Sequence, residues 1–255
     1  MRCSTRATMT QHPWIPSYAP GTTFDAPLRA TLVTRLFSES AARWPDRTAL
    51  RFEGRAFSYA EFDALTDRMA EGLQRLGVQP GTHVGLYLPN TPHYFIAFFG
   101  VLKAGGVVVN YSPLDAGAVL EHKIGDSHTD LIVTLDTPAL FSKMNGYLDS
   151  TRLKTLVVGT RDEFGAAGAA GDSGIAWDAR RVRFADLLVA APGAAPFAPP
   201  AVAVESVAVL QYTGGTTGHP KGAMLTHANL STAVAQLQAM LIDTGTLELG
   251  AERFL

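Results

Sequence analysis

Short apolar segments alternate with helical segments between residues 83 and 159, and this alternation constrains the fold more than any other feature. Short apolar runs rich in β-formers indicate strands, and longer periodic runs indicate helices. The expected strands are residues 83–88, 107–111, 131–135 and 155–159, and the expected helices are 91–104, 119–124 and 138–148. Fully apolar strands separated by helices predict a parallel sheet that is covered on both faces. The expected fold class is α/β, with layered, mostly parallel sheets and flanking helices.

A hairpin and a long amphipathic helix are expected before this sheet. Glu53 and Gly54 predict a tight turn between two short strands. Ser58 and Glu61 match a capping box, in which each side chain accepts a hydrogen bond from the backbone N–H of the other residue. Apolar residues then recur at helical spacing up to Gly77, which predicts the end of the helix.

Composition divides the chain into four expected segments. Residues 164–174 and 191–200 are rich in alanine, glycine and proline, which is typical of surface excursions and linkers. Between them, "VRFADLLVA" is expected to contain a short helix. The expected segments are a disordered lead (1–13), a first α/β subdomain (14–160), an excursion and linker (161–204) and a phosphate-loop segment (205–255).

Bulk composition excludes several classes of function. Hydrophobic residues make up 47% and charged residues 17% of the chain, which indicates a folded globular protein. The net charge of −2 gives no basic field for nucleic acid. A single cysteine, Cys3, excludes an internal disulfide and a cysteine-built metal cluster. We expect a cytoplasmic protein with no nucleic-acid partner; peripheral association with the inner membrane and the oligomeric state stay open.

The isolated polar residues do not indicate a site by themselves. The histidines lack the close spacing of a metal site, so no metal ligands are expected among His12, His83, His93, His122 and His128. His122 is expected in solvent on a helix. Helix capping and turn formation explain Asp126, Asp130 and Asp136, which fall at expected helix ends or turns.

A strand at 207–212 leads into "YTGGTTGHPKGAMLTH", residues 212–227. The Walker A pattern fails because Lys221 follows Pro220 and precedes Gly222, where that pattern needs a hydroxyl residue. The dinucleotide fingerprint fails because Gly214 and Gly215 are adjacent. The composition still suits a polyphosphate, since glycines expose backbone N–H groups, threonines donate hydroxyl hydrogen bonds and lysine adds positive charge. Composition alone also allows a glycine-rich hairpin with its lysine in solvent.

This sequence resembles the phosphate-loop signature of the AMP-forming acyl-CoA synthetases, in the adenylate-forming ligase superfamily. Residues 13–21, 77–114 and 209–218 are also similar to bacterial long-chain fatty acid–CoA ligases, and the resemblance covers most of 14–255. It implies an incomplete N-terminal domain of the adenylate-forming ligase fold. It also implies an enzyme that joins a fatty acid to CoA through an acyl-adenylate, releasing AMP and pyrophosphate. Because the family pattern starts near residue 13, Met9 stands beside Met1 as a candidate initiator.

The resemblance also implies roles for single residues. The β- and γ-phosphates of ATP are expected to bind Thr213, Gly214, Gly215, Thr216, Thr217 and Gly218. Lys221 is expected to stabilise the leaving pyrophosphate, and no other catalytic role is assigned. His227 matches a family histidine near the acyl-binding region, and a buried or helix-capping role is an equal alternative. The implied substrates and cofactors are a fatty acid, ATP, CoA and Mg²⁺.

The resemblance further implies that segments needed for activity lie beyond this chain. In the family, the adenine-binding segment, the magnesium-holding glutamate, the ribose-binding aspartate and the adenylation lysine come later in the sequence. We therefore expect little or no ligase activity from residues 1–255 alone. An uncovered sheet edge and apolar patch would also lower solubility. The alternatives are a non-catalytic, truncated remnant that binds nucleotide weakly, or an enzyme that activates aryl or amino acids.

Overall fold

The computed structural model describes residues 13–18, 20–22, 27–165, 174–190, 193, 197–214, 220–242, 245 and 247–248. Its first elements are a 3-10 helix, η1 (Ile15–Ser17), and helix α1 (Val33–Arg43). The lead expected over residues 1–13 therefore lies almost wholly outside the described residues.

The expected hairpin is confirmed. Strands β1 (Thr48–Phe52) and β2 (Arg55–Ser58) pair in antiparallel fashion, with Glu53 and Gly54 at positive φ angles of 43° and 82° in the turn. Helix α2 (Tyr59–Arg75) follows, and Ser58 Oγ accepts a hydrogen bond from the Glu61 N–H at 3.1 Å. The Glu61 carboxylate instead pairs with the Arg55 guanidinium at 2.7 Å. The serine half of the capping box is thus present, while the glutamate binds across to the hairpin.

The expected parallel sheet is also confirmed, and all four strands predicted between residues 83 and 159 belong to it. The strand order is β7-β6-β5-β3-β4-β8-β9, and every neighbouring pair is parallel except β8 and β9. The strands are β3 (His83–Leu86), β4 (Val107–Asn110), β5 (Leu131–Leu135), β6 (Thr155–Gly159), β7 (Arg181–Arg183), β8 (Val207–Thr213) and β9 (Lys221–Thr226).

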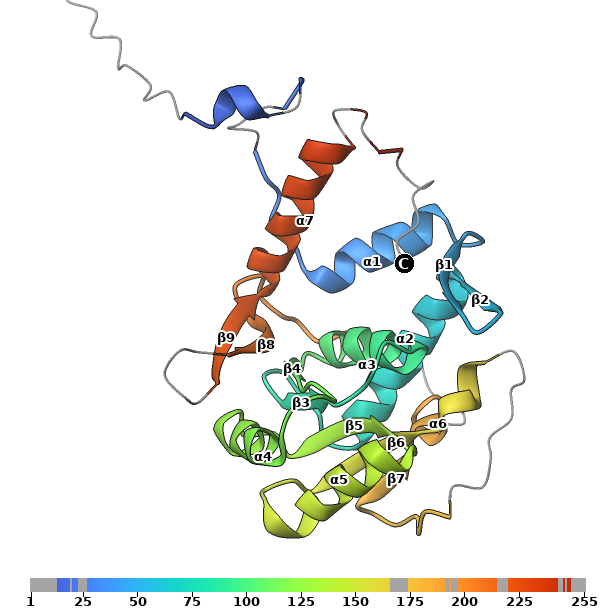
Figure 1. Ribbon diagram of the computed structural model, residues 1–255. Helices are drawn as coiled ribbons and strands as arrows, with labels where there is room; N and C mark the ends of the chain where they lie inside the picture. Colours follow the sequence, from blue (N-terminus) through green and yellow to red (C-terminus); the bar gives the residue numbers. More distant parts are fainter. Residues whose placement is uncertain are drawn as a thin grey trace, which may run out of the picture.

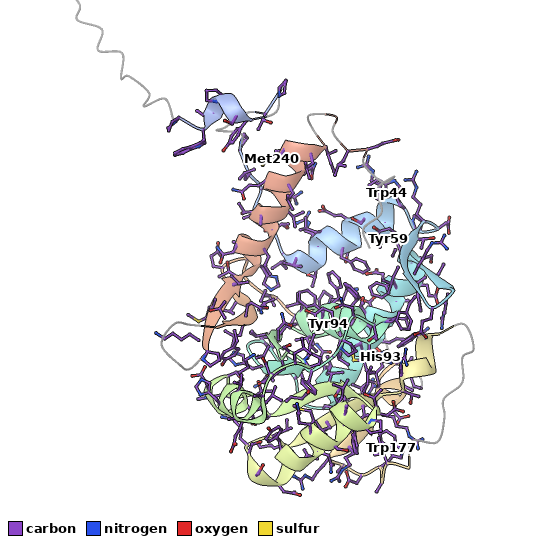
Figure 2. The ribbon with its side chains drawn as sticks, in the orientation of Figure 1. Trp44, Tyr59, His93, Tyr94, Trp177 and Met240 are labelled. Carbon is purple, nitrogen blue, oxygen red and sulfur yellow. The ribbon has the colours of Figure 1, made fainter. Side chains whose placement is uncertain are left out.

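Helices cover both faces of this sheet, as the apolar strands require (Figure 1). One core packs the sheet against α2 and α3 (Pro92–Lys103), and the other packs it against α4 (Gly117–Asp126) and α5 (Pro138–Ser150). Alternate residues of β4 serve the two cores: Val108 faces the first, and Val109 faces the second. Figure 2 shows His93 of α3 in the interior, where it is fully buried.

Residues 181–187 add more structure than the sequence indicated for this part of the chain. Only a short helix was expected here, and it is present as α6 (Phe184–Leu187), after the 3-10 helix η2 (Arg161–Phe164). The structure also forms β7, which pairs with β6 at one end of the sheet. The division of the chain at residues 160 and 204 stays a prediction, and β8 continues the same sheet by pairing with β4.

Helix α7 (His227–Leu241) follows β9 and begins with the capping box formed by Thr226 and Asn229. It extends past the start of α1, and Met240 lies near its far end (Figures 1 and 2). Its exposed large hydrophobic side chains are Val234, Leu237 and Met240. The low solubility expected from such exposure stays a prediction. Within the described part of the chain, no helix combines the length and apolar character needed to cross a bilayer.

Candidate phosphate-binding site

The β8–β9 hairpin carries the predicted phosphate-binding turn. Thr213, the last residue of β8, lies opposite Lys221, the first residue of β9. Both residues are exposed, as is Gly214. The hairpin therefore brings one hydroxyl, one glycine and one ammonium group to the end where its turn lies. The remaining predicted residues of the turn, Gly215, Thr216, Thr217 and Gly218, lie outside the described residues.

The residue pattern of the two strands explains why the hairpin forms here. In β8, Ala208, Val209 and Leu210 are buried and the Tyr212 ring faces the same core as Leu210. Gly222 lies opposite Tyr212, and a Cβ atom at position 222 would lie 3.2 Å from Cζ of the tyrosine ring. The glycine after Lys221 therefore makes room for the tyrosine that precedes Thr213.

Tyr212 connects the first stem of the turn to α4. Its hydroxyl donates a hydrogen bond of 2.5 Å to Oδ2 of Asp126, the last residue of α4. Nζ of Lys123 lies 5.3 Å from the centre of the tyrosine ring and pairs with the Asp115 carboxylate at 2.5 Å. Burial and the hydrogen bond to Asp126 raise the pKa of Tyr212, so the hydroxyl stays protonated and keeps donating.

His122 connects the second stem of the turn to the same helix. Its Nε2–H donates a hydrogen bond of 3.1 Å to the carbonyl oxygen of Pro220, the residue before Lys221. The expectation that His122 lies in solvent is wrong, because this side chain is half-buried against the hairpin. Pro220 is 98 residues away, so no local pattern could indicate the contact.

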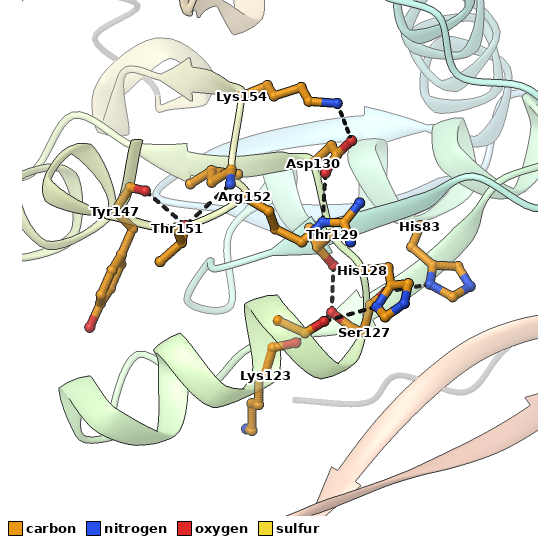
Figure 3. A network of polar contacts seen from close by, with 12 residues as sticks. His83, Lys123, Ser127, His128, Thr129, Asp130, Tyr147, Thr151, Arg152 and Lys154 are labelled. Atoms are coloured by element: carbon orange, nitrogen blue, oxygen red, sulfur yellow. Dashed lines mark hydrogen bonds and ion pairs between the residues drawn. The ribbon is translucent and has the colours of Figure 1, made fainter. Parts of the chain in front are cut away.

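The C-terminal end of α4 is held by a network of polar contacts, which Figure 3 shows from close by. Ser127 Oγ donates to the Lys123 carbonyl and lies 2.7 Å from Thr129 Oγ1. The buried Tyr111 hydroxyl lies 2.9 Å from Ser127 Oγ and donates to Thr129 at 3.0 Å. His83, the first residue of β3, donates from Nδ1 to the Ser127 carbonyl at 2.5 Å. Helix α4 is thereby fixed to the central strands of the sheet.

Burial raises the pKa of Tyr111 to about 12, with partial opposition from the hydrogen bonds to Ser127 and Thr129. The phenol is therefore neutral, and this network carries no charge at Tyr111.

A cavity of about 290 Å³ opens between this end of α4 and the hairpin, and Tyr212 and Met224 line its hairpin side.

His227 is buried, with 2% of its surface exposed, at the start of α7. Its Nδ1 accepts a hydrogen bond of 3.3 Å from the Val33 N–H. Burial lowers the pKa of His227, which favours the neutral ring that this hydrogen bond requires. His227 therefore connects the start of α7 to the start of α1. Its place in an acyl-binding region stays a prediction.

The hairpin has donors for phosphate but no carboxylate in its sequence for a metal ion. Thr213 and Lys221 are exposed donors that suit phosphate oxygens. Residues 207–226 contain no aspartate or glutamate, so the hairpin itself offers no carboxylate to Mg²⁺. Elsewhere in the described residues, no group of three His, Cys, Asp or Glu side chains is placed to hold a metal ion.

A mostly parallel α/β sheet that ends in an antiparallel hairpin with a glycine- and threonine-rich turn has the architecture of the N-terminal domain of adenylate-forming ligases. The chain belongs to the AMP-binding enzyme family, whose model matches residues 37–253. It is therefore a member of a family of AMP-forming acid–thiol ligases.

Two relatives show how far the similarity extends. The chain is 33% identical to the long-chain-fatty-acid–CoA ligase of Bacillus subtilis (strain 168), over 96% of this chain and 45% of the relative. It is 35% identical to 4-coumarate–CoA ligase 5 of Oryza sativa subsp. japonica, over 72% of this chain and 30% of the relative. The chain thus spans less than half the length of these relatives.

A solved long-chain-fatty-acid-CoA ligase from Archaeoglobus fulgidus superposes with a TM-score of 0.68 and 24% identity. The match covers 87% of this chain and 42% of that structure. This likeness shows the fold.

Proposed function

We propose that the chain is the N-terminal portion of an ATP-dependent long-chain fatty acid–CoA ligase, and that the β8–β9 turn binds the β- and γ-phosphates of ATP. The observation that carries the proposal is the pairing of Thr213 with Lys221 at the turn end of the hairpin, beside exposed Gly214. A hydroxyl donor, an unobstructed backbone and a cation suit a polyphosphate. The 33% identity to a fatty acid ligase supports a long-chain fatty acid as the substrate.

The proposed reaction has two steps. The fatty carboxylate attacks the α-phosphate of ATP, which forms acyl-adenylate and releases pyrophosphate; the CoA thiol then attacks the acyl carbon and displaces AMP. Lys221 balances the negative charge that accumulates on the departing pyrophosphate, and Thr213 donates to its oxygens. Such groups act by fixed position and by charge stabilisation in the transition state. Magnesium would neutralise further phosphate charge, with ligands from outside the hairpin.

A second candidate substrate is an aryl acid. It is favoured by the 35% identity to the 4-coumarate–CoA ligase, which is as high as the identity to the fatty acid ligase but covers less of the chain. The phosphate turn would serve both enzymes in the same way, because the activated group in each case is a carboxylate. An amino-acid-activating enzyme and a non-catalytic remnant with weak nucleotide binding are the further alternatives.

Binding measurements with inorganic tripolyphosphate and ATP test the proposed role of the turn. Lys221→Ala is expected to raise the Kd of both probes at least tenfold in isothermal titration calorimetry, because it removes a cation beside the phosphates. Lys154→Ala is the matched control, since Lys154 is an exposed lysine whose ammonium group pairs with the Asp130 carboxylate at 2.7 Å. This control is expected to stay within twofold of the unmodified chain. Equal affinities in all three proteins would overturn the proposal.

Release of pyrophosphate from ATP tests whether residues 1–255 are sufficient for activity. With oleate or 4-coumarate and CoA, the chain is expected to release no more pyrophosphate than its Lys221→Ala variant. Release that depends on oleate and disappears in Lys221→Ala would show that the chain is active by itself, contrary to this expectation. Release that depends on 4-coumarate instead would assign the aryl substrate.

A further inference from the structure

Helix α4 contacts both stems of the phosphate turn. His122 donates to the Pro220 carbonyl at 3.1 Å, and Asp126 accepts from the Tyr212 hydroxyl at 2.5 Å. His122 and Asp126 are four residues apart, so they lie on the same face of the helix. Figure 1 shows α4 next to the β8–β9 hairpin, on the side of the sheet that it shares with α5.

Each contact lies one residue away from a predicted phosphate ligand. Tyr212 precedes Thr213, and Pro220 precedes Lys221. We propose that His122 and Asp126 are positioning residues for ATP binding, which fix the separation and direction of Thr213 and Lys221 through the two stems. This inference rests on the proposed function of the turn and assigns a role to a helix outside it.

The opposite face of α4 is fixed, so the helix can act as a rigid support. Leu120 and Ile124 are fully buried in the core that α4 forms with the sheet. At its C-terminal end, Ser127 is held by Thr129 and His83 (Figure 3). The Tyr111 hydroxyl also contacts Ser127. A displacement of Tyr212 or Pro220 relative to α4 therefore requires the contact with Asp126 or His122 to break.

Phosphate contacts need accurate placement of the groups that donate to the phosphate oxygens. A shift of about 1 Å in a positioned group can lower a rate by about a hundredfold. The attraction between a cation and a phosphate also weakens with distance. Strand β8 is held in the sheet by β4, whereas β9 is the last strand of the sheet and pairs with β8 alone. Two anchors on one helix, one to each strand end, restrict how the two strand ends separate and twist.

The first variants test the contact between Asp126 and Tyr212. Asp126→Ala removes the acceptor, whereas Asp126→Asn keeps an oxygen acceptor at the same place. Asp126→Ala is expected to raise the Kd of inorganic tripolyphosphate three- to tenfold, and Asp126→Asn is expected to stay within twofold. Tyr212→Phe is expected to match Asp126→Ala, and the double variant is expected to be no worse than either single variant.

The second pair of variants tests His122. His122→Ala removes the donor to Pro220 and is expected to raise the Kd of tripolyphosphate about threefold. His122→Gln, whose side-chain amide can donate in the same direction, is expected to restore binding to within twofold. Glu121→Ala, at the neighbouring exposed position of α4, is the control and is expected to leave the Kd unchanged.

The outcomes separate this inference from the proposed function and from a purely structural role. If Lys221→Ala leaves the Kd unchanged, the proposed function fails. If Lys221→Ala weakens binding while Asp126→Ala, Tyr212→Phe and His122→Ala do not, the positioning role is overturned and the turn keeps its function. Losses in Asp126→Ala and Tyr212→Phe that simply add in the double variant, or that Asp126→Asn and His122→Gln fail to restore, would also overturn it.

Discussion

Nδ1 of His227 accepts a hydrogen bond from the backbone N–H of Val33, a residue 194 positions earlier in the chain. One turn further along α7, Ser231 Oγ accepts from the Thr31 N–H at 2.9 Å. Val33 is the first residue of α1, so its N–H has no acceptor within the helix. Helix α7, which begins directly after the hairpin, thus supplies side-chain acceptors to backbone N–H groups at the N-terminus of α1 and just before it.

We expect Ser231→Ala to destabilise the protein by about 1–3 kcal/mol, because it leaves the buried Thr31 N–H without its side-chain acceptor. The shift in the midpoint of urea unfolding measures this loss. Ser150→Ala is the matched control, since Ser150 is exposed at the end of α5. The control should change stability by less than about 0.5 kcal/mol. Equal losses in the two variants would contradict this explanation of the buried contact.

We expect the free energy of unfolding to decrease as the pH falls, over a pH range that the pKa of His227 sets. Because burial lowers the pKa of His227 in the folded state, the unfolded chain binds more protons once the pH falls below the ordinary histidine pKa of about 6.5. The stabilising contribution of the neutral ring is complete above that pH. It decreases as the pH falls from about 6.5 to the lower pKa of the folded state.

The measurement compares the free energy of unfolding at pH 7.5 and pH 5.5 in the unmodified chain and in His227→Asn. The asparagine oxygen can still accept from the Val33 N–H but does not titrate in this range. The pH-dependent loss should be smaller in His227→Asn. An identical loss in both proteins would assign the effect to other groups.

Gly100 and Gly146 are expected to respond to alanine in opposite directions. A Cβ atom at Gly100 would lie 2.4 Å from Cγ of Met69, where α3 crosses α2, whereas a Cβ atom at Gly146 in α5 meets nothing within 4 Å. Gly100→Ala should cost about 1–3 kcal/mol through overpacking. Gly146→Ala should stabilise by about 0.5–1 kcal/mol through helix propensity. The midpoints of thermal unfolding of both variants measure these changes in stability. An unchanged midpoint in Gly100→Ala would contradict the close contact between α2 and α3.

Lys103 tests the cost of leaving a buried charge without partners. Its ammonium group is almost fully buried and pairs with Asp63 at 2.7 Å and Asp67 at 2.5 Å, while both carboxylates are partly exposed. Asp63→Ala with Asp67→Ala should cost about 3–5 kcal/mol, because the buried ammonium loses both counter-charges. Lys103→Met should cost less, since water can still solvate the carboxylates. Urea unfolding measures both losses of stability. A larger loss in Lys103→Met than in the double aspartate variant would contradict the cost expected for an unpaired buried ammonium group.

The sheet could be predicted because its signals are local. The strands from β3 to β6 are short, mainly apolar runs. In the β1–β2 hairpin, Glu53 and Gly54 indicate the turn without reference to the rest of the fold. Strand β7 was missed because it has three residues, two of them arginines, and pairing with β6 alone makes it a strand. The glutamate half of the capping box was also predicted wrongly because of a contact outside the motif. The Glu61 carboxylate pairs with Arg55 of the hairpin.

The candidate site could be predicted only in part. The turn was identified through a family resemblance, because its order of residues fits neither of the two general phosphate-loop patterns. The contacts of α4 had no signal in the sequence. Asp126 and Tyr212 are 86 positions apart, and an aspartate at the end of a helix is sufficiently explained by local hydrogen bonding.

The central claim is that the turn between Thr213 and Lys221 holds the phosphate tail of ATP. Its most direct test is isothermal titration of ATP into the chain and into a variant in which the order of residues 213–218 is scrambled at constant composition. The variant should retain its urea unfolding midpoint and bind ATP at least tenfold more weakly. Equal affinity for ATP in the two proteins would contradict the claim.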